Sequence, residues 1–147
     1  MSQQQPDKVR TIEQAYDDER PWGGYDVLVD EPDHKVKTLT VKPGARLSLQ
    51  SHRRRQEHWF IVRGEATVTL GPVDLENDQL EEKVLRAGDF IDIPRGYKHR
   101  VANNNRSAPL VFIEVQTGDY FGEDDNIRYA DDYDRESPEY EGADEGS

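Results

Sequence analysis

Short segments in which polar and apolar residues alternate recur through most of this chain. Residues 35–41 and 46–52 alternate in this way, which is typical of a strand with one buried face. Turn residues such as Pro43-Gly44 separate the segments. Further strands are predicted at residues 57–62, 66–70, 83–85, 90–93, 99–102 and 110–116. At least seven short strands without a convincing long helix predict an all-β barrel or sandwich.

The length and the charge distribution predict one domain with an acidic end. A chain of 147 residues is the size of a single barrel. Residues 123–147 hold 11 of the 31 acidic residues but only 2 of the 19 basic ones. We therefore expect a lead-in over residues 1–19, a barrel over residues 20–122, and an acidic segment over residues 123–147 that is partly disordered or packed on the barrel.

Composition also excludes several classes of function. The net charge is −12, and residues 21–122 are nearly neutral, so a nucleic-acid surface is not expected. No stretch has the ~18 apolar residues that cross a bilayer, and no secretory signal is visible, so a cytoplasmic protein is expected. The absence of cysteine excludes disulfides, thiolate metal sites and a cysteine nucleophile.

Several possible metal ligands lie on two neighbouring predicted strands. Gln50 and His52 are two residues apart, so in a strand they point to the same face. Glu57 follows a four-residue connection, and an antiparallel hairpin would place it opposite His52 with Cβ atoms about 5 Å apart. Glu57 and His58 point to opposite faces, and we assign Glu57 to the interior because it shares a face with Trp59 and Ile61.

Two spaced patterns resemble the motifs of the cupin family. The first is Gly44-(x5)-Gln50-x-His52-(x4)-Glu57-(x6)-Gly64, and the second is Gly88-(x5)-Pro94-x-Gly96-x2-His99-x3-Asn103. The resemblance implies a double-stranded β-helix, the cupin or jelly-roll barrel. It also implies one divalent metal ion, held by Gln50, His52, Glu57 and His99. Such a nitrogen and oxygen donor set suits Zn, Mn, Fe, Co or Ni.

A narrower resemblance covers roughly residues 19–135. The segments that carry it are Arg20-Pro21-Trp22-Gly23, Arg55-x-Glu57-His58-Trp59 and Glu114-x-Gln116-x-Gly118-x-Tyr120. They are similar to the type II mannose-6-phosphate isomerase domain, which also forms the C-terminal half of bifunctional mannose-1-phosphate guanylyltransferase/isomerase enzymes. No Gly-rich nucleotide loop is present, so guanylyltransferase activity is not implied.

The narrower resemblance implies interconversion of mannose 6-phosphate and fructose 6-phosphate through a cis-enediol. The bound metal would stabilise the negative charge that develops on the sugar oxygens. The residues expected to take part in catalysis are Arg55, Glu114 and Arg135. The residues expected to bind the sugar phosphate are Lys37, Gln116 and Arg128.

Two other functions stay open. The first is a non-catalytic cupin that binds a sugar, a sugar phosphate or a nucleotide sugar. The second is another cupin enzyme, such as a dioxygenase or a decarboxylase, although those usually have a second histidine where this chain has Gln50. Phe60 and Val62 are expected on the outer face, where exposed apolar residues indicate a partner surface, so a homodimer is also expected.

Overall fold

This computed structural model describes residues 20–132 of the chain. These residues contain ten strands and two short 3₁₀ turns, joined by loops. The strands are β1 (Gly23–Asp30), β2 (His34–Val41), β3 (Leu49–Ser51), β4 (Arg55–Arg63), β5 (Glu65–Pro72), β6 (Glu81–Arg86), β7 (Phe90–Ile93), β8 (Tyr97–Ala102), β9 (Leu110–Gly118) and β10 (Ile127–Ala130), and the 3₁₀ turns are η2 (Asn77–Gln79) and η3 (Glu123–Asp125). No helix among these residues has the length and apolar character needed to cross a membrane.

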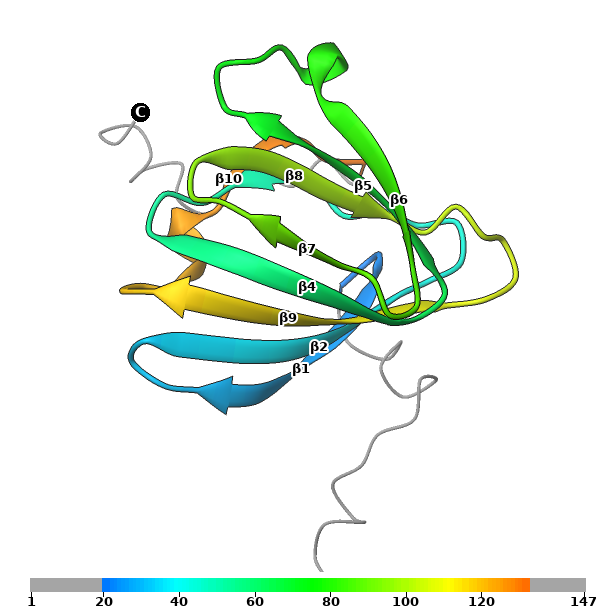
Figure 1. Ribbon diagram of the computed structural model, residues 1–147, viewed down its shortest axis with the longest axis horizontal. Coiled ribbons are helices and arrows are strands. Elements are labelled where there is room, and N and C mark those ends of the chain that lie inside the picture. The colour runs from blue at the N-terminus through cyan, green and yellow to red at the C-terminus, as the bar shows by residue number, and fades with distance from the viewer. Residues whose placement is uncertain (1–19, 133–147) are drawn as a thin grey trace, which may run out of the picture.

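The strands form two five-stranded sheets that face each other (Figure 1). The first sheet has the order β1-β2-β9-β4-β7, and the second has the order β10-β3-β8-β5-β6. All the pairings are antiparallel. Apart from the consecutive pairs β1–β2 and β5–β6, neighbours in each sheet come from distant parts of the chain. This arrangement confirms the predicted double-stranded β-helix.

The inner faces of the two sheets enclose the hydrophobic core. Along β4 the side chains alternate between buried and more exposed, so that Glu57, Trp59 and Ile61 point inward while Phe60 points outward. The fully buried apolar core includes Val41, Ile61, Ala66, Val68, Val101, Leu110 and Phe112. A second group of buried residues is polar and lines one pocket, which we call the polar end of the barrel: Ser48, His52, Arg55, Glu57, His99, Glu114 and Gln116.

The predicted strands are found at nearly the predicted positions, with three differences. No strand was predicted over residues 23–30, where β1 lies. The strand expected over residues 46–52 is shorter, because regular pairing in β3 covers only Leu49–Ser51 and Arg46 makes an isolated bridge to Ala102. In addition, β10 lies within the predicted acidic segment and pairs with β3. The division into three segments otherwise stays a prediction.

Candidate metal centre and ligand pocket

Three of the four predicted metal ligands come together at the polar end of the barrel. His52, Glu57 and His99 each offer a donor atom, and these three atoms lie within 4.8 Å of one another. His52 follows β3, Glu57 lies on β4 and His99 lies on β8, so both sheets contribute. All three side chains are buried.

The hairpin that the sequence predicted for His52 and Glu57 is wrong. β3 belongs to the second sheet and β4 to the first, so the two strands share no ladder of hydrogen bonds. The chain crosses between the sheets at residues 52–54, and the two side chains meet across the interior. His52 Nδ1 lies 3.3 Å from Glu57 Oε2.

Neighbouring groups orient Glu57 and His99. Trp59 Nε1 donates to Glu57 Oε1 at 2.9 Å, and Arg55 Nε lies 3.7 Å from Glu57 Oε2. His99 Nδ1 lies 3.1 Å from the Tyr97 carbonyl oxygen. A carbonyl only accepts, so Nδ1 carries the proton and Nε2 keeps the lone pair. That Nε2 lies 3.8 Å from Glu57 Oε1.

Burial keeps both histidines neutral at neutral pH. Desolvation holds the pKa of His52 well below its usual value, and the positive charge of Arg55 lowers it further. Desolvation also lowers the pKa of His99, to about 4. Neutral imidazoles offer lone pairs to a cation. His52 Nε2 is buried with no hydrogen-bond partner among residues 20–132, which fits a site that holds a metal ion.

Gln50, the fourth predicted ligand, lies beside these three residues. It is the direct cross-strand partner of His99, and it lines the same pocket. Its Nε2 donates to Ser48 Oγ at 3.0 Å. An amide nitrogen has no lone pair for a cation, so the side-chain oxygen would be the donor.

The pocket around this group contains every other predicted site residue that the structure describes. Its lining includes Lys37, Arg55, Glu114, Gln116 and Arg128. Arg135 lies outside the described residues. The lining also includes residues to which the sequence analysis gave no role there, namely Arg20, Trp22, Tyr25, Ser48, Arg100 and Asn126.

Arg20, just before β1, and Tyr25, within it, were missed because this part of the chain carried no ligand pattern of its own. Arg20 Nη2 donates to Tyr25 Oη at 2.8 Å, and Lys37 Nζ lies 4.3 Å from the centre of the Tyr25 ring. Trp59 was placed on the inner face but was given no role at the site, although its position two residues after Glu57, on the same face, indicated that the two side chains could meet.

Glu114 is a buried carboxyl group that faces the same pocket. Gln116 Nε2 donates to it. Desolvation raises the pKa of Glu114 to about 7, and the nearby charge of Glu57 adds to the shift. At neutral pH, Glu114 is therefore a group that can both donate and accept a proton.

The raised pKa of Glu114 predicts a pH-dependent loss of stability in the metal-free protein. Between pH 4.5 and 7 the unfolded chain releases the Glu114 proton while the folded protein retains it, so the free energy of unfolding falls as pH rises. Glu114→Gln should lack this fall, and its stability relative to wild type should rise across that window and level off above it. Urea unfolding in a chelator at several pH values measures this difference. If the free energy of unfolding changed with pH in the same way in both proteins, this prediction would be wrong. The control is Glu82→Gln, because Glu82 is exposed and its loss should not change the pH dependence.

The sequence matches a known protein family and several longer proteins. The model of the family described as mannose-6-phosphate isomerase C-terminal matches residues 6–131. The chain is 46% identical over 116 residues to the xanthan biosynthesis protein XanB of Xanthomonas campestris pv. campestris, covering 79% of this chain and 23% of XanB. It is 42% identical over 116 residues to a mannose-1-phosphate guanylyltransferase of Salmonella montevideo, with the same coverage. The chain therefore spans less than a quarter of the length of these relatives.

Among solved structures, the capsular polysaccharide assembling protein CapF from Staphylococcus aureus has a similar fold. The TM-score is 0.67 at 21% identity, and the match covers 77% of this chain and 33% of CapF. This likeness supports the fold alone.

Proposed function

The chain belongs to the mannose-6-phosphate isomerase C-terminal family, and from this premise we propose that it is a cupin domain that binds a sugar phosphate without converting it. A free sugar and a nucleotide sugar are the alternative ligands that we consider for this pocket. The observation that carries the proposal is a set of buried polar atoms in the pocket. Gln116 Oε1 and Arg55 Nε have no hydrogen-bond partner among residues 20–132. A ligand with hydroxyl and phosphate groups would satisfy both.

The expectation of a stand-alone mannose-6-phosphate isomerase is wrong. The relatives are named as a mannose-1-phosphate guanylyltransferase and a xanthan biosynthesis protein, and this chain corresponds to 23% of their length. The names describe the long proteins and give no isomerase activity to this segment by itself. Arg55 and Glu114 are therefore interpreted as groups that contact a bound sugar.

The metal ion is part of the proposal because the donor set fits one. His52, Glu57 and His99 would hold it, with the Gln50 amide oxygen as a fourth donor. A bound divalent ion would attract the hydroxyl oxygens of a sugar. Two imidazoles with carboxylate and amide oxygens suit Zn, Mn, Fe, Co or Ni. Trp59 and Tyr97 would keep Glu57 and His99 aimed at the ion.

Lys37 is the residue that we propose for the phosphate group. It is the cross-strand partner of Glu114 on the inner face of the first sheet, and it lines the pocket. Its ammonium group lies over the Tyr25 ring, which helps to fix the direction of a flexible side chain. Arg55 and Arg128 add positive charge to the same lining. This excess of basic residues favours an anionic ligand.

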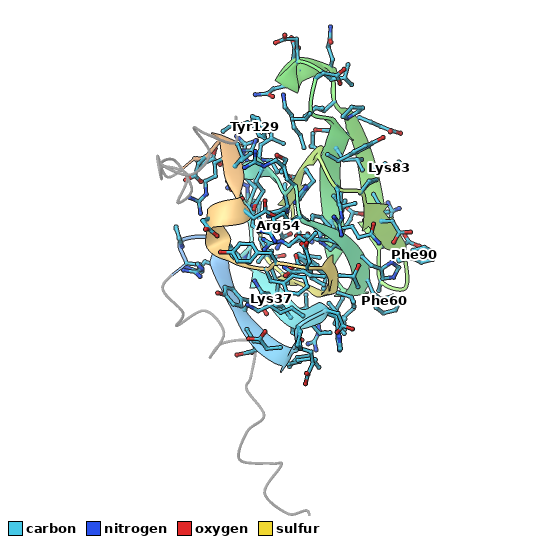
Figure 2. The ribbon with its side chains drawn as sticks, turned by 90° about the vertical axis from the view of Figure 1, so that its left-hand side faces the viewer. Lys37, Arg54, Phe60, Lys83, Phe90 and Tyr129 are labelled. Carbon is cyan, nitrogen blue, oxygen red and sulfur yellow. The ribbon has the colours of Figure 1, made fainter. Side chains whose placement is uncertain are left out.

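Three further expectations stay predictions. The names of the relatives favour a role in polysaccharide biosynthesis. A second is the cytoplasmic location. A homodimer would use the outer face of the first sheet, where Phe60 and Phe90 are direct cross-strand partners and are 42% and 59% exposed. Figure 2 shows these two side chains on the same side of the molecule.

Substitution of Lys37 tests the proposal. Lys37→Met keeps most of the side-chain volume and removes the charge, and we expect it to raise the Kd for mannose 6-phosphate about tenfold, the effect of one partly buried charged hydrogen bond. The Kd for mannose itself should not change. Titration calorimetry of the metal-loaded protein gives both values. Lys83→Met is the matched control, because Lys83 is exposed on β6, away from the pocket (Figure 2).

Two results would overturn the proposal. One is the absence of binding of mannose 6-phosphate, mannose or a nucleotide sugar by wild-type protein fully loaded with metal. The other is formation of fructose 6-phosphate in a coupled assay with the same sample. Binding without conversion is the expected result.

A further inference from the structure

We propose that Asp125 is a positioning residue that holds the crossing between the two sheets, and so sets the distance between His52 and Glu57. The crossing is the chain over residues 52–54. The inference rests on the proposed metal centre, because these two residues are its ligands. Asp125 is the last residue of η3, and the sequence gave no indication of a role for it.

The carboxylate of Asp125 accepts two hydrogen bonds from the crossing. Its Oδ1 accepts from the backbone N–H of Arg53 at 3.1 Å, and its Oδ2 accepts from that of Arg54 at 3.0 Å. The side chain is 4% exposed. Hydrogen bonds from backbone amides to a carboxylate are stronger than those between neutral groups. Both oxygens of one rigid group thus fix two successive peptide units directly after His52.

The segment that leads to Asp125 approaches the same crossing. We call residues 119–126 the strap. The backbone N–H of Asp119 donates to the Arg54 carbonyl at 3.4 Å, and Arg55 Nη1 donates to the Gly122 carbonyl at 3.4 Å. The Asp125 backbone N–H donates to the same Gly122 carbonyl at 3.1 Å, which closes the turn that carries its carboxylate.

Gly118 allows this approach. A Cβ atom at Gly118 would lie 2.3 Å from the Arg54 carbonyl oxygen and 2.9 Å from Arg55 Cα, and its φ is +155°. A side chain at this position would push the strap away from the crossing.

The residues after the strap contact the chain directly before the crossing. In β10, Ile127 pairs with Ser51 and Arg128 pairs with Gln50. Ser51 Oγ and Tyr129 Oη are 2.8 Å apart. The strap and β10 thus connect the end of β9 in the first sheet to β3 in the second. Figure 2 shows Arg54 and Tyr129 near this part of the chain.

A fixed crossing matters because no ladder joins β3 to β4. In a hairpin, interstrand hydrogen bonds would set the separation of His52 and Glu57. Here His52 follows a strand of the second sheet, and Glu57 lies in the first sheet. The separation of the two ligands therefore depends on residues 52–54 and on the groups that hydrogen-bond to them. Loss of a group that orients metal ligands typically weakens metal binding about 10–100-fold.

The test compares Asp125→Asn with Asp124→Asn. Asp124 is the adjacent exposed residue, and its carboxylate accepts from Tyr120 Oη instead of the crossing. Asp125→Asn keeps one acceptor oxygen and replaces the other with a donor that faces a backbone N–H. We expect the Kd for Co²⁺ to rise about tenfold in Asp125→Asn and to stay within about twofold of wild type in Asp124→Asn.

Two further measurements separate positioning from a change of charge. The visible absorption of bound Co²⁺ reports its coordination geometry, and this spectrum should change in Asp125→Asn only. In the metal-free wild type, the amide protons of Arg53 and Arg54 should exchange slowly with solvent, and they should exchange faster in Asp125→Asn. The near-ultraviolet circular dichroism of the buried Trp22 and Trp59 shows whether each variant is folded.

The outcomes distinguish this inference from the proposed function. Unchanged Co²⁺ affinity and an unchanged spectrum in folded Asp125→Asn would overturn the inference while leaving the metal centre intact. Rapid exchange of the Arg53 and Arg54 amides in the wild type would overturn it without any variant. If the wild type binds no Co²⁺ although these amides are protected, the metal centre itself is wrong, and Asp125 holds only the fold.

Discussion

Replacing His52 or His99 with alanine is expected to remove nearly all bound metal and to leave the barrel folded. Each substitution deletes one of three donors that lie within 4.8 Å of one another. Loss of an outer partner already costs about 10–100-fold in metal affinity, so loss of a ligand should raise the Kd more than about 100-fold. Elemental analysis after dialysis and titration with Zn²⁺ measure the loss.

The barrel should survive because other residues build the apolar core, and the contact of His99 with it is an edge-on packing against Trp59 at its border. The matched control is His58→Ala. His58 follows Glu57 directly, but its ring faces outward and its Nδ1 lies 2.6 Å from Asp92 Oδ1. Full metal content in both His52→Ala and His99→Ala would show that the ligand assignment is wrong. Loss of metal in His58→Ala would point to an effect on the fold.

Replacing Asn103 with alanine is expected to lower the free energy of unfolding by about 4 kcal/mol. Asn103 is 1% exposed and follows β8. The two hydrogens of its Nδ2 are shared among the carbonyl oxygens of Val41, Lys42 and Ala108, at 3.1, 3.3 and 2.9 Å. Its Oδ1 accepts from the Asn105 N–H at 3.1 Å. The truncated side chain would leave one buried and several partly buried backbone groups without this partner. An unsatisfied buried group costs about 1–3 kcal/mol.

Urea unfolding of metal-free protein measures this loss, and Asn104→Ala is its control. Asn104 is exposed, and its Nδ2 donates to Thr67 Oγ1 at 3.0 Å. Its removal should cost less than about 1 kcal/mol. Equal stability losses in the two variants would show that the Asn103 hydrogen bonds do not hold the β8–β9 connection to β2.

Much of the fold was predictable because a sheet with one buried face repeats every two residues. This period placed the strands and assigned Glu57 to the interior and His58 to the outside, as the burial along β4 shows. The two spaced patterns likewise named His52, Glu57 and His99, which the structure brings together. The resemblance to the mannose-6-phosphate isomerase family was also confirmed, whereas the stand-alone isomerase was wrong.

The pairing of strands was not predictable from alternation, because alternation does not tell a strand which partner it has. Local reasoning joined β3 and β4 into a hairpin, although they belong to different sheets. For the same reason, the contribution of Arg20 and Tyr25 to the pocket was missed, since β1 reaches the site only through its pairing with β2.

The order of side chains along each strand establishes which residues face inward and which chemical groups are available, so both could be predicted from local sequence. The meeting of His52 and Glu57 across two sheets, and the hydrogen bonds of Asp125 to the crossing between them, come from the folded barrel. Those contacts join residues as far apart as 53 and 125, and their distances depend on how the whole barrel closes.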